Sequence, residues 1–403
     1  MMINRETLLN TLYPEDILSI AKDLTDGELE LLKQLNELLE QKYRKDVNRH
    51  WVNATVPEDF FEDIGKLNYF TNPLLFKGRE GAKTPSQLFQ FFMAYTLARF
   101  DVSLATLLGV HQGLGHNTFL FGGSKEQVAK YVPKLQSHEL RTCFALTEPD
   151  HGSDVAGGLA TTAEQNGDVW ILNGEKKWIG GAHVSDIIPV FAVNTETGKP
   201  HCFIVKPDQQ GVEIDVLQDK IALRIVPNAH IKLTNVQVTE ADRLQNITSF
   251  KDIAKILYST RAGVAYMATG ALAGTLRATL DYVKSRQQFG KSISKYQLVQ
   301  EKVSMIQGNL AHAMAISAAL ARKQANGEYD EVATSTAKMM NALRLRESVA
   351  MGRGVCGGNG ILAGDYDIAR FFSDAEAIFT YEGTHEINAL VIGRALTGDS
   401  AFI

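Results

Sequence analysis

Cysteine is scarce in this chain: only Cys143, Cys202 and Cys356 occur among its 403 residues. They are odd in number, far apart and without Cys-x-x-Cys spacing, which argues against a disulfide framework and against a zinc site, so no metal site is expected. The stretch Met1–Glu6 also lacks the basic region and following apolar run of a secretion signal. A reducing cytoplasm is therefore the expected location.

Long apolar runs and an excess of basic charge are missing as well. Two stretches without Asp, Glu, Lys or Arg, residues 102–124 and 303–321, approach the ~20 residues that span a bilayer. Polar side chains such as His111 and Gln307 interrupt both, so no membrane-spanning helix is expected. The net charge of −5 provides no field that would attract phosphate backbones, and nucleic acid is not an expected partner.

The chain does contain ample apolar sequence, 45% of its residues, to bury more than one core. Apolar residues recur at three- and four-residue spacing in the first and last thirds, which predicts helices, and at strand-like spacing between turn residues in the middle. We therefore predict an α+β protein with a helical N-terminal domain over residues 1–142, a middle β-domain over 143–247 and a helical C-terminal domain over 248–403. The predicted helices are 28–43, 86–108, 125–135, 252–286, 297–326 and 330–352, and the predicted strands are 143–146, 169–172, 186–193, 201–205, 212–217 and 229–238.

Near the C-terminus, Glu382 stands between Tyr381 and Gly383. Burial beside the tyrosine would raise the pKa of the carboxyl group toward neutrality, and the glycine leaves room for a substrate to approach. Such a carboxylate can act as a general base toward a weakly acidic C–H. The alternative is that Glu382 only caps a helix beginning near Thr384, with Glu386 in the first turn, where the helix dipole favours acidic residues.

A loop in the middle domain carries exposed donors. Pro149 and Gly152 force a loop after a predicted strand, which leaves backbone N–H groups and the hydroxyls of Thr147 and Ser153 to bind a flat polar ring or a phosphate. An ordinary turn held by its own hydroxyls is the alternative. Trp178, at the end of a later strand, offers either a flat binding face or a core side chain.

Two further positions suit an anionic ligand. Arg286, followed by Phe289, presents a fork of donors that matches phosphate, although a surface salt bridge is equally consistent with it. Gly357 and Gly358 permit a close backbone approach, although a glycine-rich turn often only ends a helix.

Five segments occur in the order and approximate spacing of acyl-CoA dehydrogenases: 145–154 (ALTEPDHGSD), 177–179 (KWI), 285–290 (SRQQFG) with Gln297, 357–360 (GGNG) and 381–384 (YEGT). From about residue 90 to the C-terminus the sequence resembles that flavoprotein family, and five linked motifs are far more specific than one. The resemblance implies an α+β fold with an N-terminal helical domain, a middle antiparallel β-barrel or sandwich and a C-terminal four-helix bundle.

The resemblance also implies FAD as cofactor and an acyl-CoA substrate, which is dehydrogenated to the trans-2-enoyl-CoA. Glu382 would remove the α-proton, and the β-hydrogen would leave as hydride to the flavin. It further implies a homotetramer, a dimer of dimers in which Arg286 reaches the FAD pyrophosphate of a neighbouring subunit, and electron-transferring flavoprotein or O2 as electron acceptor. The implied cofactor contacts are Phe144, Leu146, Thr147, Gly152, Ser153, Trp178, Ile179, Gly180, Arg286, Phe289, Gln297, Gly357, Gly358, Thr384 and Glu386, and the implied substrate contacts are Ser153, Arg261, Tyr381 and Gly383.

Two departures from the family pattern leave alternatives open. Gly180 replaces a threonine whose hydroxyl bonds the flavin in many members, and residues 101–106 and 178–180 are similar to short-chain acyl-CoA oxidases, so oxidase activity is an alternative. The tail 380–387 is close to glutaryl-CoA dehydrogenases, in which an arginine binds the distal carboxylate.

Ungapped alignment places Ala105 at that arginine position, and Arg99 is turned about 240° away from it on a helix. A short monocarboxylic acyl group is therefore expected, with glutaryl-CoA as the alternative. A catalytically idle flavin-binding scaffold is the non-enzyme alternative, although the retained Glu382 and the negative net charge argue against it.

Overall fold

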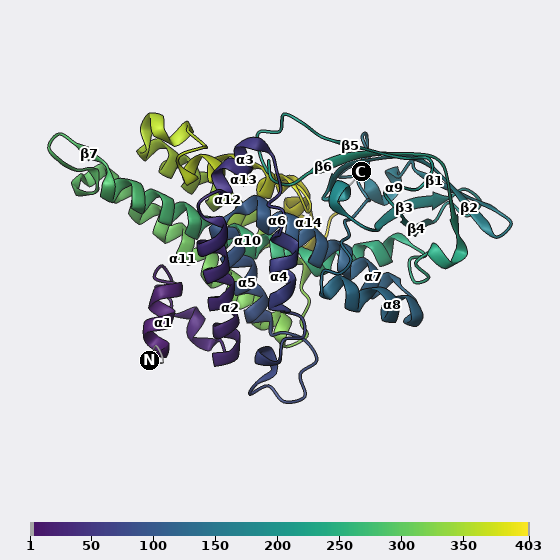
Figure 1. Cartoon of the computed structure of the whole chain (residues 1–403), viewed down its shortest axis with the longest axis horizontal. Helices are drawn as coiled ribbons and strands as arrows, with labels where there is room; N and C mark the ends of the chain where they lie inside the picture. The colour runs from purple at the N-terminus through teal and green to yellow at the C-terminus, as the bar shows by residue number, and fades with distance from the viewer. Residues whose placement is uncertain (1–3, 402–403) are drawn as a thin grey trace.

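The computed structural model describes residues 4–401, in which a helical part, a β-sheet and a second helical part follow one another along the chain (Figure 1). Residues 1–3 and 402–403 lie outside the described part. Residues 1–3 are the first half of the stretch in which no secretion signal was expected. The α+β class and the order of the three parts are confirmed. No helix within residues 4–401 is long and apolar enough to cross a bilayer.

The N-terminal part is all helical. Its longest helix, α5, was predicted to run on into α6, but Asp101 between them is extended (φ −158°, ψ 127°) and caps α6 by accepting a hydrogen bond from the Leu104 N–H at 2.7 Å. The prediction of one helix over 86–108 is therefore wrong at this break. The elements are α1 (Arg5–Leu12), α2 (Asp26–Leu38), the π-helical turn Leu39–Tyr43, α3 (Val47–Asn53), α4 (Phe60–Leu67), α5 (Gln87–Phe100), α6 (Val102–Gly109), the π-helical turn η4 (Val110–Gly115), α7 (His116–Gly122) and α8 (Lys125–Gln136).

The middle part is one six-stranded sheet with the strand order β4-β3-β1-β2-β6-β5. One pair departs from the antiparallel arrangement that we predicted: β1 and β3 are parallel, because the chain reverses once between β1 and β2 and again between β2 and β3. The strands are β1 (Thr162–Asn166), β2 (Val169–Gly180), β3 (Ile188–Asn194), β4 (Pro200–Val205), β5 (Val212–Val216) and β6 (Asn228–Thr239), with the short helix α9 (Val155–Gly158) before β1.

Two strand predictions were wrong. The segment 143–146 is no strand but makes single bridges, Thr142 to Ile187 and Ala145 to Val190. Strand β1 was missed because its sequence, TAEQN, is polar and its last three residues are exposed, so it lacks apolar alternation.

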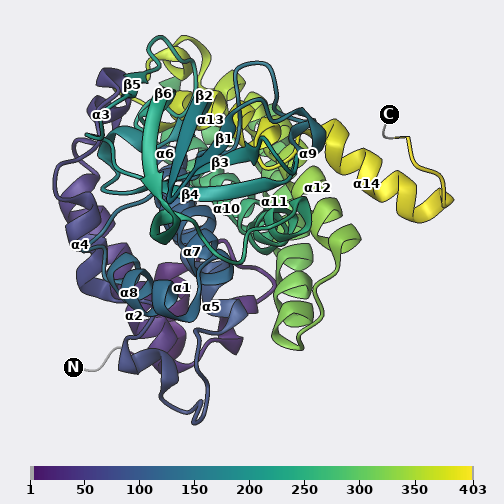
Figure 2. The same cartoon turned by 90° about the vertical axis from the view of Figure 1, so that its right-hand side faces the viewer.

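The C-terminal part consists of long helices: α10 (Phe250–Ser285), α11 (Gln297–Ala325), α12 (Glu331–Val355), α13 (Asp367–Thr380) and α14 (His385–Thr397). Helix α13 was not predicted. Two segments stand off the body of the molecule: the hairpin of β7 (Gln287–Gln288) and β8 (Lys291–Ser292), at the left of Figure 1, and α14, at the right of Figure 2. Apolar residues of the N- and C-terminal helices form one shared core, whereas the sheet has its own.

Buried polar groups join the three parts. Asp374 of α13 accepts hydrogen bonds from the Trp51 indole of α3 (3.0 Å), the Ser103 hydroxyl of α6 (2.7 Å) and the Leu223 N–H between β5 and β6 (2.7 Å). Arg370, one turn earlier on α13, forms a buried ion pair with Asp101. These contacts fix α13, and with it the chain that follows, against the other two parts.

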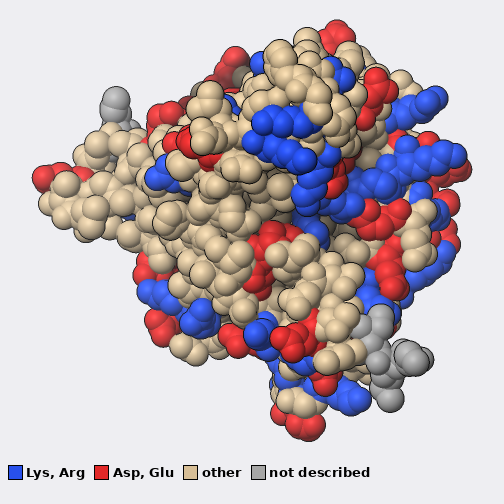
Figure 3. Space-filling view, turned by 90° about the vertical axis from the view of Figure 1, so that its left-hand side faces the viewer, with Lys and Arg blue, Asp and Glu red and all other residues tan. Residues whose placement is uncertain are grey.

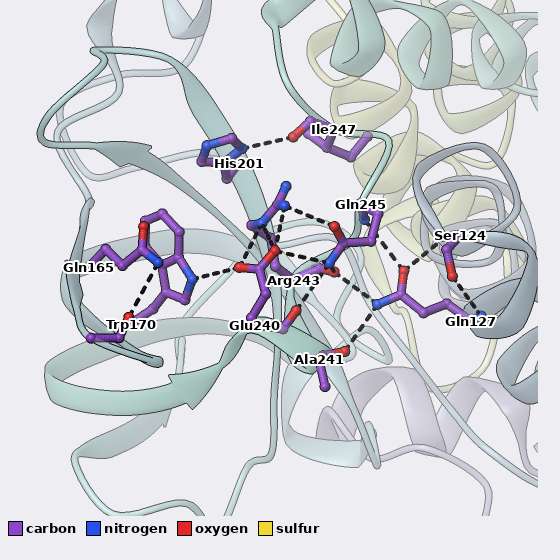
Figure 4. Close-up of polar contacts among 11 residues, drawn as sticks. Ser124, Gln127, Gln165, Trp170, His201, Glu240, Ala241, Arg243, Gln245 and Ile247 are labelled. Carbon is purple, nitrogen blue, oxygen red and sulfur yellow. Dashed lines mark hydrogen bonds and ion pairs between the residues drawn. The ribbon is translucent and has the colours of Figure 1, made fainter.

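A second polar cluster joins the far end of the sheet to α8 (Figure 4). The Gln127 side-chain amide donates to the carbonyls of Ala241 (3.1 Å) and Arg243 (2.8 Å) just after β6. Glu240 accepts from the Trp170 indole of β2 at 2.9 Å and pairs with Arg243.

Candidate active site

Glu382 lies in the short link between α13 and α14, and its backbone is left-handed, with φ +57° at Glu382 and +83° at Gly383. A glutamate in this region is conformationally strained, and such strain is concentrated at functional sites. The N-cap of α14 is Thr384, whose hydroxyl accepts from the Ile387 N–H at 3.2 Å. The alternative in which Glu382 serves only as the cap is therefore wrong, while Glu386 does lie in the first turn as predicted.

The two carboxylate oxygens of Glu382 have different surroundings. Oε1 accepts a hydrogen bond from the Thr260 hydroxyl of α10 at 3.1 Å, whereas Oε2 is buried and has no partner within residues 4–401. Burial raises the pKa of Glu382 to about 7, an effect that Arg261, the Thr260 hydrogen bond and Lys338 partly offset. The carboxylate thus has the properties of a base that works near neutral pH.

The predicted substrate contacts fall into two groups. Tyr381 is hydrogen-bonded to Thr106 of α6 at 3.2 Å, and Arg261 donates to the Ser335 hydroxyl at 3.1 Å. A side chain at Gly383 would lie 3.8 Å from the Arg261 guanidinium. These three residues gather around Glu382, whereas Ser153 lies exposed on the middle-domain loop.

That loop is held by groups that the sequence did not single out. Glu148 forms a buried ion pair with Lys176 of β2 at 2.7 Å and accepts from the Thr161 N–H at 2.9 Å. Among the described residues, the hydroxyls of Thr147 and Ser153 take no part in holding the turn, so the alternative of a self-held turn is wrong. The loop is rigid at its base and leaves both hydroxyls for a ligand.

Trp178 is not a core residue. It has φ +65° at an irregularity of β2, and 57% of its surface is exposed. The following residues, Ile179 and Gly180, are buried, and a Cβ on Gly180 would lie 3.3 Å from a methyl of Val226. The indole face is therefore free to lie against a planar ligand, while the position after it is tightly packed.

A groove of about 520 Å³ lies where the β7–β8 hairpin, the end of α10 and the end of α12 meet. It brings together four of the predicted cofactor residues, Arg286, Phe289, Gly357 and Gly358. Phe289 is 94% exposed. Arg286 makes no ion pair within the described residues, so the alternative that Arg286 forms a surface salt bridge is wrong. An arginine beside two glycines in a groove suits the pyrophosphate of a dinucleotide.

The remaining predicted cofactor residues lie near these three places. Phe144 is half-buried and Leu146 buried just before the loop, Gly152 is exposed within it, and Gln297 begins α11 beside the hairpin. Around Glu382, the residues that the sequence analysis missed are Thr260 and Lys338. Lys338 had a signal, because it falls on the buried side of α12 with Thr334, Asn341 and Leu345 at three- and four-residue spacing.

A buried carboxylate, an exposed indole, free loop hydroxyls and a groove with an arginine are the kinds of group that suit an oxidoreductase with a planar, phosphate-bearing cofactor. The chain matches the acyl-CoA dehydrogenase N-terminal domain over residues 25–139, the middle domain over 143–236 and the C-terminal domain over 250–397. It belongs to the acyl-CoA dehydrogenase family and is an FAD-dependent enzyme.

Three known proteins illustrate the likeness. A 3-(aryl)acrylate reductase of Clostridium sporogenes is 36% identical over 282 residues, which is 69% of this chain and 74% of the relative. A subunit of the caffeyl-CoA reductase-Etf complex of Acetobacterium woodii is 27% identical over 94% of this chain and 97% of the relative. A glutaryl-CoA dehydrogenase of Mycobacterium smegmatis, solved in complex with FADH2, superposes with a TM-score of 0.88 at 27% identity over 97% of this chain and 99% of the neighbour.

Proposed function

We propose that this protein converts an acyl-CoA thioester to the trans-2-enoyl-CoA, with Glu382 as the base that removes the α-proton. The observation that carries the proposal is the buried carboxylate of Glu382, with one oxygen held by Thr260 and the other without a partner within residues 4–401. An unpartnered oxygen on a base whose pKa is about 7 is suited to accept a proton from carbon. Bound FAD supplies the acceptor for the β-hydride.

The chain's own groups orient the reactants. The exposed face of Trp178 and the hydroxyls of Thr147 and Ser153 bind the flavin side of the site. Tyr381, through its hydrogen bond to Thr106, packs the Glu382 link against α6 and excludes water from the carboxylate. The Glu382 backbone N–H, which has no backbone partner among the described residues, is proposed to donate to the thioester carbonyl oxygen, as the family resemblance implies, and to stabilise the negative charge that develops there.

The acyl group is proposed to be short and monocarboxylic. Ala105, at the position that binds a distal carboxylate in the resemblance above, is buried in α6. Arg99 is engaged elsewhere, 3.0 Å from Glu15 and bonded to the Leu12 carbonyl. Faster flavin reduction by butyryl-CoA than by glutaryl-CoA is expected, and the reverse order would contradict the assignment.

A second candidate is the reduction of an arylacrylic substrate, since two relatives are reductases of arylacrylate and caffeyl-CoA. The same base would then protonate the α-carbon. Reoxidation of the dithionite-reduced enzyme by 3-phenylacryloyl-CoA without air, faster than by crotonyl-CoA, would favour this candidate.

The electron acceptor is proposed to be an electron-transferring flavoprotein, with O2 as the alternative that Gly180 leaves open. A relative that is a subunit of an Etf complex supports the former. The three cysteines are free and buried, which is consistent with the cytoplasmic location that we propose.

A homotetramer, built as a dimer of dimers, is proposed from the resemblance, with each flavin site shared between two subunits. Thr260 lies in α10 and Arg286 is the C-cap of that helix, 26 residues later and about 39 Å further along the helix axis. The groove of one subunit therefore serves the Glu382 of another. The face turned toward the hairpin has a broad area without charged side chains (Figure 3), and the hairpin and α11 expose Phe289 and Leu298, the latter 77% exposed.

The test is the visible spectrum of the purified holoenzyme as butyryl-CoA is added without air, in parallel with Glu382→Gln. The flavin of the wild-type enzyme should bleach, and the flavin of Glu382→Gln should stay bound and oxidised. If neither butyryl-CoA nor any other acyl-CoA bleaches the wild-type flavin, the proposal is wrong. Bleaching that persists after air is admitted supports a protein acceptor, and rapid recovery with peroxide supports the oxidase alternative.

A further inference from the structure

Lys338 is a lysine in the first half of α12 whose side chain is fully buried, with 0% of its surface exposed. Lysine is rarely buried to this extent unless its ammonium group is paired. Its Nζ donates to two backbone carbonyls, those of Phe379 at 3.1 Å and Gly383 at 2.7 Å.

The two carbonyls stand on either side of Glu382. Phe379 lies in the last turn of α13, where carbonyls lack helical partners and cations are favourable, and Gly383 directly precedes the N-cap of α14. Asn388 also donates to the Gly383 carbonyl, at 2.9 Å, but from within α14 itself. Lys338 thus connects the end of one helix to the start of the next from a third helix.

The charged groups around this link come from three helices. Arg261 faces it from α10, Lys338 and Arg346 face it from α12, and His385 and Glu386 face it from α14, with Arg346 and His385 packed on the Phe379 ring. Burial lowers the pKa of Lys338 to about 8, and the charges of Glu382 and Glu386 partly offset this. In turn, the Lys338 ammonium group lowers the pKa of Glu382, so each favours the charged form of the other.

We infer that Lys338 is a positioning residue for Glu382: its ammonium group ties α13 to α14, holds the Glu382 backbone in the left-handed conformation and keeps a positive charge beside the carboxylate. The inference rests on the proposed function, because it assigns Lys338 a role in the work of that base. A lysine that filled a gap in the core would make no paired contacts around one strained residue.

The test compares Lys338→Met, which keeps an unbranched side chain one atom shorter than that of lysine and removes the charge, with Asn341→Leu as the matched control. Asn341 is one turn further along α12, equally buried, and donates to Ala265, Thr269 and Ser317 instead of the Glu382 link. In Lys338→Met, flavin content should be unchanged and kcat should fall about 10²-fold, the cost of a misplaced catalytic group, with a smaller change in KM. The acid limb of the pH profile should move to higher pH, because the positive charge beside Glu382 is gone.

A measurement independent of turnover is hydrogen exchange of peptides covering residues 379–388. Exchange there should be faster in Lys338→Met than in the wild type or in Asn341→Leu. Unchanged kcat, pH limb and exchange in Lys338→Met, or the same changes in Asn341→Leu, would overturn the inference. If no acyl-CoA reduces the wild-type flavin, the proposed function fails by itself, while the exchange comparison still decides the role of Lys338.

Discussion

At the scale of single residues, the chemistry of Glu382 comes from its neighbours in space. Its carboxylate is buried, which favours the protonated form, while Thr260, Arg261 and Lys338 favour the ionised form. The result is a carboxyl group with a pKa of about 7. At neutral pH a substantial fraction of the molecules therefore carry the ionised carboxylate, and that carboxylate is still basic enough to accept a proton.

Turnover should therefore rise with pH through about 7, as the Glu382 carboxyl loses its proton. Thr260→Val removes a hydrogen bond to the ionised form, which raises the pKa and moves this acid limb to higher pH, with a rate loss at pH 7 of roughly tenfold at most. Initial rates between pH 5 and 9 measure the shift. Thr275→Val is the control, since the Thr275 hydroxyl bonds the Ala271 carbonyl of its own helix; a limb that stays in place in Thr260→Val would contradict the role of this hydrogen bond.

Removing the carboxylate of Glu382, the proposed base, has the largest expected effect on turnover. Glu382→Gln should lower kcat by at least the ~10²–10⁴-fold that general acid–base catalysis contributes, and FAD should remain bound. Stopped-flow flavin reduction measures the loss. Glu376→Gln, which breaks the surface ion pair between Glu376 of α13 and Arg346 of α12, should leave the rate unchanged. A Glu382→Gln enzyme with the wild-type rate would exclude Glu382 as the base.

At the scale of elements, α10 organises the site. Its 36 residues extend about 54 Å, with the Glu382 contacts Thr260 and Arg261 near one end and Arg286 just beyond the other. Between these ends, Gly270 lets the helix approach α5 closely, since a Cβ there would fall onto the carbonyl oxygen of Tyr95. Close packing at this point sets the position of Thr260 against the N-terminal helices.

The substitution Gly270→Ala should therefore destabilise the protein by about 1–3 kcal/mol through overpacking against α5. Gly263→Ala on the same helix is the matched control, because a Cβ there meets nothing within 4 Å. The control should be neutral or stabilising by about 0.5–1 kcal/mol, since alanine favours a helix over glycine. Urea titration of both holoenzymes measures the difference, and equal effects would show that the contact between α10 and α5 is not tight.

At the scale of the whole molecule, the proposed sharing of a flavin site between subunits can be tested by complementation. Arg286→Ala alone should weaken FAD binding, and Glu382→Gln alone should abolish turnover. A mixed dimer of the two variants contains one site with both native residues. Coexpression with two affinity tags should thus restore activity to as much as half that of the wild type, whereas no recovery would mean that Arg286 and Glu382 serve the same subunit's site or that Arg286 has no role.

The sequence by itself determined the class of the fold, the family and the identity of the motif residues. Local patterns carried this information. Helical spacing located α10, α11 and α12, and each of the motifs that contain Thr147, Trp178, Arg286 and Glu382 is a single continuous stretch of sequence. The sequence did not predict strand β1, helix α13 or the parallel pairing of β1 with β3. A polar strand shows no alternation of apolar and polar residues, and strand direction depends on how the chain connects the strands in space.

Only the tertiary structure decided what gives the Glu382 carboxyl group a pKa near neutrality. Thr260 lies 122 residues before it and Lys338 lies 44 residues before it, so no local pattern shows that one binds its carboxylate and the other brackets its backbone. The pairing of Glu148 with Lys176 likewise joins a loop to a strand across the sheet. A pKa near neutrality arises from burial and from charges in three dimensions, and for that physical reason it belongs to the folded chain rather than to the motif.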